Sequence, residues 1–230
     1  MEATDIRKIT ADVRRGNEWS VRVLSHNGFE LQGGSDEILH YAYFRRETDA
    51  SRIFRPENGW KILWCAGGCF WGTEKVFRIL DGVKETCVGY VNGNTEHPCY
   101  EDVSRGDTGY KEAVQIIYDP ALITLETLMK AFFLCIDPTV QNRQGNDIGS
   151  QYQTGVYYLE EEDGEVLRRI FEEEKTKQGR FMTELEPVRN FQPAEEYHQR
   201  YLDKHPFGYC HITKIEMDAV RELNKKKVNA

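Results

Sequence analysis

One cysteine of this chain lies where its thiol could become reactive. Cys69 stands in the run Gly68-Cys69-Phe70-Trp71-Gly72. The apolar residues 62–66 before it have the composition of a buried strand, and residues 74–80 after it have apolar side chains at helical spacing. Cys69 is therefore predicted in the first turn of a helix, where unpaired N–H groups and the helix dipole lower the pKa of a thiol.

The two aromatic residues after the cysteine suggest a pocket for an apolar group. Phe70 and Trp71 are large enough to wall a slot beside the sulfur, which would place a nucleophile at its mouth. Taken alone, however, a cysteine in a strand-to-helix turn is more often a small buried apolar residue than a nucleophile. A catalytic role for Cys69 therefore needs support from the rest of the chain.

A glutamate at the start of a second apolar segment is a candidate proton donor. Glu112 precedes the strand-like residues 113–118. A carboxyl group at the edge of an apolar pocket loses hydration, which raises its pKa and keeps it protonated near neutral pH. Such a group can donate a proton to a reacting atom. Without further support, a glutamate at a strand end is more often simply solvated.

Five stretches together resemble the A-type peptide methionine sulfoxide reductases. The pentapeptide around Cys69 is similar to the active-site signature of that family, and the other four stretches match the family in order. They are Tyr100-Glu101-Asp102-Val103, Glu112-Ala113-Val114, Asn142-Arg143-Gln144-Gly145-Asn146-Asp147 and Ala194-Glu195-Glu196-Tyr197-His198-Gln199. The resemblance extends over about residues 60–212, and five spaced matches make it specific.

The resemblance implies both a fold and an activity. Interleaved strands and helices suggest only a layered α+β or α/β sheet. The family implies an α+β domain, a two-layer sandwich with a mixed central sheet of ferredoxin-like type. It also implies reduction of methionine-S-sulfoxide, free or in proteins, as a repair of oxidised proteins that uses neither a metal nor a flavin.

Roles for individual residues follow from the same resemblance. Cys69 is expected to attack the sulfoxide sulfur while Glu112 passes a proton to the oxygen, which leaves Cys69 as a sulfenic acid after methionine departs. Tyr100 and Tyr152 are expected to hydrogen-bond the oxygen. The residues expected to contact the substrate are Phe70, Trp71, Tyr100, Asp147 and Tyr152.

The six cysteines of the chain suggest how the enzyme would be recycled. Gly208-Tyr209-Cys210 matches one context of the family's recycling cysteines, so Cys210 is expected to form a disulfide with Cys69. An external dithiol such as thioredoxin would reopen that disulfide by exchange. The remaining cysteines stay as alternatives, namely Cys65, Cys87, Cys99 and Cys135. Three of these, Cys65, Cys87 and Cys135, lie in apolar strands or a helix and are expected to be inert. No CxxC pair and no histidine at ligand spacing accompany them, so no metal site is expected.

Composition excludes several other classes of protein. The formal net charge of −8 is unlike the basic footprint of a nucleic-acid-binding protein. No run approaches the roughly 18 apolar residues of a membrane span. The first residues lack the apolar core of a signal peptide, so cytoplasmic residence is expected.

The chain is predicted to have three parts: an N-terminal extension over residues 1–58, a catalytic domain over 59–212 and a C-terminal tail over 213–230. Residues 20–24 and 29–31 flank Asn27-Gly28 and predict a hairpin. The extension lies outside the resemblance and contains no cysteine. It is expected to pack on the catalytic domain, because its apolar residues need cover; a partner-binding arm is the alternative.

Within the catalytic part, periodicity and turn residues predict the order of elements. Residues 141–153 are predicted as a substrate-binding loop, and Glu195 and His198 as a pair at the edge of the site. The predicted strands are 83–91, 113–118 and 154–159, and the predicted helices are 122–136, 160–178 and 194–204.

Three positions depart from the family pattern. Tyr110-Lys111 replaces the common His-Ala, and Ile148 replaces a common histidine.

Two other functions would use the same residues. A thiol peroxidase would use Cys69 without the aromatic slot. A cysteine hydrolase would need His198 as the base beside Cys69.

Overall fold

The computed structural model describes residues 8–26, 29–44, 56 and 59–225. The chain divides into two compact units, Met1–Asp49 and Ala50–Ala230. Among the described residues, no helix has both the length and the apolar character that crossing a membrane requires.

The described residues of the first unit form a three-stranded antiparallel sheet and one helix. The elements are β1 (Lys8–Arg14), α1 (Glu18–His26), β2 (Glu30–Gly34) and β3 (Ile38–Phe44), with strand order β1-β3-β2. The strand predicted over residues 20–24 is wrong, because these residues lie in α1. Asn17 caps this helix by accepting a hydrogen bond from the Ser20 N–H at 3.1 Å. The predicted turn at Asn27-Gly28 lies outside the described residues.

The second unit is organised around a six-stranded mixed sheet. Its strand order is β10-β9-β4-β6-β5-β11, and among the described strands β10 and β9 form the one parallel pair. The strands are β4 (Lys61–Ala66), β5 (Val83–Val91), β6 (Lys111–Tyr118), β9 (Gly155–Tyr158), β10 (Glu184–Pro187) and β11 (Phe191–Pro193). A short hairpin, β7 (Arg143–Gln144) with β8 (Asp147–Ile148), stands apart from this sheet.

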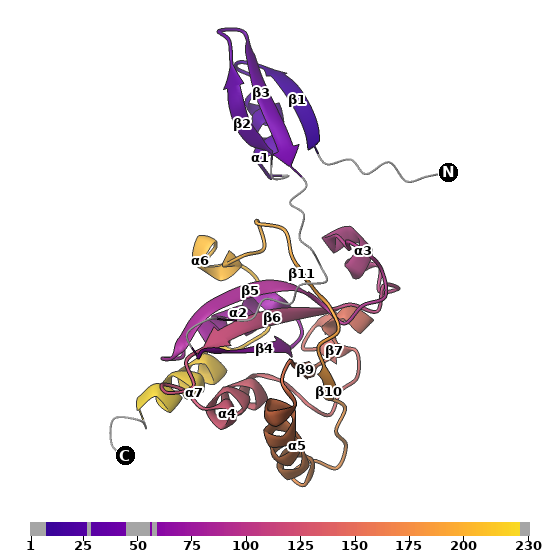
Figure 1. Ribbon diagram of the computed structural model, residues 1–230, viewed down its shortest axis with the longest axis vertical. Helices are drawn as coiled ribbons and strands as arrows, with labels where there is room; N and C mark the ends of the chain where they lie inside the picture. The colour runs from indigo at the N-terminus through magenta and orange to yellow at the C-terminus, as the bar shows by residue number, and fades with distance from the viewer. Residues whose placement is uncertain (1–7, 27–28, 45–55, 57–58, 226–230) are drawn as a thin grey trace. The chain divides into compact units, whose positions relative to one another are not determined.

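Helices cover one face of the six-stranded sheet and share the main core with it. Figure 1 shows α4, α5 and α7 along one side of the sheet. Strand alternation decides which side chains meet them: Leu63 and Cys65 face the helical core, whereas Trp64 packs with Phe191 on the other face. The helices are α2 (Phe70–Arg78), α3 (Tyr100–Ser104), α4 (Leu125–Cys135), α5 (Glu161–Lys175), α6 (Tyr201–Lys204) and α7 (Lys214–Lys225), with a 3-10 turn η1 (Ser150–Tyr152).

The predicted mixed sheet with packed helices is confirmed, while its ferredoxin-like two-layer type stays a prediction. Two segments differ from expectation. The helix predicted over 194–204 is reduced to α6, and turns occupy most of the rest. The predicted C-terminal tail contains α7, whose buried Met217 and Val220 belong to the main core. Apolar residues three apart on one helical face explain why this segment packs.

The departure at Tyr110 has a packing explanation. The side chain of Tyr110 is buried, and its hydroxyl donates a hydrogen bond to the Thr95 carbonyl at 2.8 Å. Its ring fills the space beside Gly93, where an added Cβ would lie 2.0 Å from Tyr110 Cδ2. Lys111 next to it lies 3.4 Å from the Glu184 carboxylate. Both residues therefore have structural partners on neighbouring segments.

Replacing Gly93 by alanine is expected to destabilise the second unit. The added methyl group overlaps the buried Tyr110 ring, and overpacking of a filled core costs about 1–3 kcal/mol. Chemical denaturation followed by tryptophan fluorescence should show a lower midpoint for Gly93→Ala. Gly179→Ala is the matched control, because a Cβ at Gly179 meets nothing within 4 Å. Equal midpoints for the two variants would contradict this explanation of Tyr110 packing.

Candidate active site

A tight turn between β4 and α2 presents Cys69. Gly68 has φ +81°, and an added Cβ there would lie 2.5 Å from Gln144 Cβ, so both backbone conformation and space require glycine. Cys69 is the N-cap residue of α2, as predicted. Thr73 Oγ1 donates to the carbonyls of Gly67 at 3.2 Å and Cys69 at 3.3 Å, which fixes the turn from within the helix.

The carboxyl group of Glu112 meets the beginning of α2. Glu112 is 3 % exposed, and its Oε2 accepts a hydrogen bond from the Phe70 backbone N–H at 3.1 Å. Burial raises the pKa of Glu112 to about 8; the Phe70 N–H opposes this shift, and the charge of Asp147 adds to it. The carboxyl is therefore mainly protonated at neutral pH, which agrees with the prediction from its place at the edge of an apolar pocket.

The lowered pKa predicted for Cys69 is wrong for this structure. Burial and then the charge of Glu112 raise the pKa of the Cys69 thiol well above its ordinary value, while the Trp71 backbone N–H lowers it. The helix N-terminus does favour the thiolate, but the loss of water outweighs it. When Glu112 is protonated, its charge no longer opposes ionisation of the Cys69 thiol. The two groups together therefore carry one negative charge more readily than two.

A cluster of rings supports the two aromatic residues after Cys69. The Trp71 indole N–H donates to His198 Nδ1 at 3.2 Å, and its ring stacks on Tyr201 at a centroid distance of 3.7 Å. Phe70 and Tyr100 also contact the His198 ring, at 5.1 and 4.8 Å between centroids. His198 therefore supports the aromatic side chains, and its ring is 2 % exposed.

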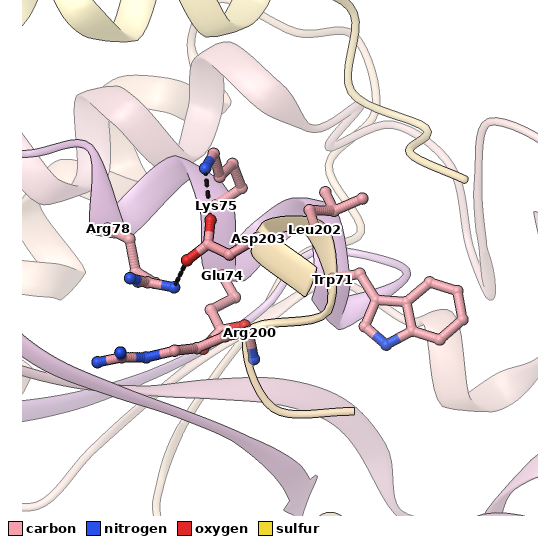
Figure 2. Close-up of a pocket in the computed structure, with 7 residues that line it drawn as sticks. All are labelled: Trp71, Glu74, Lys75, Arg78, Arg200, Leu202 and Asp203. Atoms are coloured by element: carbon pink, nitrogen blue, oxygen red, sulfur yellow. Dashed lines mark hydrogen bonds and ion pairs between the residues drawn. The ribbon is translucent and has the colours of Figure 1, made fainter. Parts of the chain in front are cut away.

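The pocket on the outer side of Trp71 is not the predicted apolar slot. Figure 2 shows Asp203 between Lys75 and Arg78, with Trp71 at one end of the pocket. The Lys75 ammonium lies 2.7 Å from the Asp203 carboxylate, and Arg78 is also hydrogen-bonded to it. Charged side chains predominate in this lining, which contains neither Cys69 nor Glu112.

The two tyrosines predicted from the sequence lie within electrostatic range of the thiol and the carboxyl. Burial raises the pKa of Tyr100 and of Tyr152, and the charges of Glu112 and Cys69 raise both further. Glu195 holds the Tyr100 end of α3, since its carboxylate accepts from the Tyr100 N–H at 2.9 Å and from the Tyr90 hydroxyl at 2.9 Å. Both phenols stay protonated and can donate hydrogen bonds.

The predicted substrate loop is an ordered structure. Gln153 Oε1 accepts from the Asn142 N–H at 2.7 Å, and Ser150 Oγ donates to the Gly106 carbonyl at 2.7 Å. Asp147 lies in β8 with a side chain that is 15 % exposed, and it acts on the pKa of both Cys69 and Glu112. Ile148, one of the departures from the family pattern, is 70 % exposed and contributes no core contact.

Cys210 lies against the helix that begins at Cys69. A Cβ built on Gly72 would lie 3.0 Å from Cys210 Sγ and 3.2 Å from Ile212, so the segment packs directly on the first turn of α2. Every cysteine is a free thiol in this structure. The Cys99 thiol donates to Asp102 at 3.0 Å, and the same carboxylate caps α3 by accepting from the Cys99 N–H at 3.2 Å.

The sequence interpretation assigned no role to Tyr209 or His211, which also reach the site. Burial and hydrogen bonding to Asp147 raise the pKa of Tyr209 to about 12. The side chain of His211 is 4 % exposed, and its Nδ1 lies 3.8 Å from Asp147 Oδ2. The sequence offered one signal for these two residues, namely their position on either side of Cys210. No periodicity marks residues 205–212 as part of the core.

The described residues include no group of three or more histidine, cysteine, aspartate or glutamate side chains that could hold a metal ion. The expectation of a metal-free reaction stays a prediction.

Comparison with known proteins gives a consistent result. A family model described as peptide methionine sulfoxide reductase matches residues 61–229. A relative from Clostridium acetobutylicum, named peptide methionine sulfoxide reductase MsrA, is 54% identical over 155 residues, which cover 67% of this chain and 95% of the relative. The relative of that name from Mycoplasma pneumoniae is 48% identical over 153 residues, which cover 66% of this chain and 98% of the relative.

Solved structures give the same result. Reduced Mxr1 from Saccharomyces cerevisiae has a TM-score of 0.66 and 40% identity, covering 70% of this chain and 95% of that protein. Methionine sulfoxide reductase A of Corynebacterium diphtheriae has a TM-score of 0.63 and 35% identity, covering 69% and 81%.

Glu112→Gln is expected to stabilise the protein at alkaline pH. Between the ordinary carboxyl pKa of 4.5 and about 8 the folded protein keeps the Glu112 proton while the unfolded chain releases it, so the stability of the wild type falls across this range and levels off above it. Glutamine stays neutral and can still accept from Phe70 N–H, so the melting temperature of the variant should exceed that of the wild type at pH 9.

The difference should shrink at pH 5, where the wild-type carboxyl is protonated. Glu101→Gln is the control, since Glu101 is exposed on α3. A difference in melting temperature that is independent of pH would contradict the assigned burial effect.

Proposed function

The chain belongs to the peptide methionine sulfoxide reductase family, and on that premise we propose that it reduces methionine-S-sulfoxide, free or in proteins, to methionine. The supporting observation is that the Glu112 carboxyl, mainly protonated at neutral pH, is hydrogen-bonded to the residue after Cys69 and acts on the thiol through its charge when ionised. A sulfoxide needs a soft nucleophile at sulfur and a proton for its oxygen. Repair of oxidised proteins is the corresponding biological role.

In the first step, the Cys69 thiolate attacks the sulfoxide sulfur while Glu112 transfers its proton to the oxygen. The hydroxyl groups of Tyr100 and Tyr152 donate hydrogen bonds to that oxygen as its charge develops. The buried carboxyl suits this role because it is protonated at neutral pH and its pKa, at about 8, lies close to the working range.

The aromatic side chains orient the substrate. Phe70 and Trp71 contact the S-methyl group, and His198 and Tyr201 hold Trp71 by its N–H and its ring face. Asp147 lies at the same site and acts on the tyrosines and on Glu112 through its charge. Fixed rings reduce the loss of entropy on binding.

Release of methionine leaves the sulfoxide oxygen on Cys69 as a sulfenic acid. Cys210 then supplies the second thiol, since its sulfur packs against Gly72 in the first turn of the same helix. An external dithiol of the thioredoxin type restores both thiols by exchange. No cofactor held by the chain enters this cycle.

The domain limits also remain proposals. Residues 59–212 carry the proposed chemistry, and residues 1–58 form an N-terminal extension to which we assign no role. Residues 213–230 follow as the C-terminal part. Cytoplasmic residence stays a prediction.

The hydrolase alternative is disfavoured by the surroundings of His198. Its Nδ1 already accepts from the Trp71 indole N–H, and its ring packs against Phe70 and Tyr100, which assigns it to the support of the aromatic side chains rather than to general-base catalysis. A thiol peroxidase remains the second candidate, because a peroxide needs the same thiol and proton donor.

The first experiment compares both epimers of methionine sulfoxide, with dithiothreitol as the reductant. We expect the wild-type protein to reduce the S epimer and leave the R epimer unchanged, because the site fixes both the methyl group and the oxygen. Cys69→Ser should lose turnover completely, since serine is a poor nucleophile toward sulfur. Turnover of hydrogen peroxide without turnover of either epimer would favour the peroxidase.

Cys210→Ser is expected to separate the two reductants. With thioredoxin the steady-state rate should fall by about a hundredfold, because a tethered thiol can raise the effective concentration by about 10²- to 10⁴-fold. With dithiothreitol the loss should be much smaller, since this small dithiol can reach the sulfenic acid directly.

Cys87→Ser provides the matched control, as Cys87 lies in β5 away from the proposed pair. Full activity of Cys210→Ser with thioredoxin would show that another cysteine, or none, completes the cycle.

A further inference from the structure

We propose that His211 is a positioning residue for disulfide formation: wedged between the Cys69 turn and the Asp147 loop, it holds the Cys210 thiol against α2. The proposal rests on the proposed function and adds a residue to its second step. His211 lies outside the thiol, carboxyl and tyrosine set that acts on the sulfoxide.

The imidazole of His211 fills a space between two segments of the site. On one side, a Cβ built on Gly68 would lie 3.3 Å from its Nε2. On the other side, Asp147 Oδ2 lies 3.8 Å from its Nδ1, and a Cβ on Gly145 would lie 3.5 Å from its Cβ. The ring therefore spans from the residue before Cys69 to the loop that carries Asp147.

The burial of this ring is not explained by hydrogen bonding. A hydrogen bond from the ring to the Gly67 backbone contributes to the pKa of His211, but among the described residues it falls short of ordinary geometry, and Asp147 Oδ2 also has no partner there. Burial lowers the pKa of His211, and the Asp147 charge opposes this shift, so the ring is neutral at neutral pH. Burying an unpaired polar ring costs free energy. The contribution of the ring that its contacts support is packing between Gly68 and the loop that carries Gly145 and Asp147.

The residues on either side of His211 attach the same segment to α2. Cys210 Sγ lies 3.0 Å and Ile212 lies 3.2 Å from a Cβ built on Gly72, and Ile212 is 6 % exposed. These two contacts hold the segment against the helix but do not reach the turn before Cys69. His211 supplies that third point of attachment, which fixes the approach of Cys210 along the helix.

The step that His211 would assist is a balanced condensation. The Cys210 thiol attacks the sulfenic sulfur of Cys69, an S–S bond forms, and the sulfenic hydroxyl leaves with the thiol proton as water. One sulfur is oxidised and the other reduced, so no external oxidant is needed. Its rate depends on how often the two sulfur atoms meet in line.

The test is a single turnover of the full-length protein without added reductant. Reduced wild type, His211→Ala and His211→Gln are mixed with methionine-S-sulfoxide and quenched over time. Methionine is quantified, the sulfenic acid is trapped with dimedone, and the Cys69–Cys210 disulfide is measured by mass spectrometry after alkylation. Thermal melting checks the fold of each variant, and Lys214→Ala, at an exposed position of the same segment, is the control.

For His211→Ala we expect disulfide formation to slow by about tenfold to a hundredfold, since a misplacement of about 1 Å can cost that much. Dimedone-trapped Cys69 should accumulate, while methionine release in the first turnover changes far less. His211→Gln should recover part of the rate, because its amide reaches the space of the Nε2 side of the ring.

Unchanged disulfide formation in a folded His211→Ala protein would overturn the proposal. Equal slowing of methionine release and disulfide formation would also overturn it, since that result assigns His211 to the substrate site or to general stability. Failure of the proposed function is a separate result, in which the wild-type protein itself forms no methionine.

Discussion

The hydrogen bond from the Phe70 N–H to the Glu112 carboxyl joins the two halves of the candidate site. One partner is the first residue of α2, directly after Cys69, and the other comes from the neighbouring strand β6. Such a bond forms only if β4 ends at Ala66 and the chain turns within the two glycines that follow. The close approach of Gln144 to Gly68 gives the turn no room for a larger residue.

The burial that keeps the Glu112 carboxyl protonated also disfavours ionisation of the Cys69 thiol. Both groups lose water, the charge of Glu112 raises the pKa of the Cys69 thiol, and the charge of Asp147 raises the pKa of both groups. A site of this kind holds one negative charge more easily than two. Formation of the thiolate is therefore coupled to a neutral carboxyl, which is the protonation state that transfer of a proton to a sulfoxide oxygen requires.

The C-terminal segment adds a second thiol, that of Cys210, to the candidate site around Cys69. Helix α7 belongs to the main core through Met217 and Val220, and so the chain before it is held close to α2. Cys210 packs on Gly72, where an added Cβ would lie only 3.0 Å from its sulfur. The core and the proposed redox pair thus depend on the same short stretch of chain.

The sequence alone determined the family, the place of Cys69 between a strand and a helix, and most strands and helices of the second unit. These features depend on local patterns, namely apolar periodicity, glycine pairs and spaced motifs. It also predicted the acidic character of Glu112, because an apolar strand beside a carboxyl already implies lost hydration. Local patterns failed at residues 20–24, which resemble a strand but begin after the cap at Asn17.

Only the tertiary structure decided the electrostatics of Cys69 and the place of the C-terminal segment. The balance between helix dipole and burial depends on how many atoms from distant segments exclude water from the thiol, which no local pattern records. Likewise, His198, Tyr209 and His211 acquire their neighbours from elements far away in the sequence. Contacts of that kind arise from packing, and so they could not be read from residue spacing.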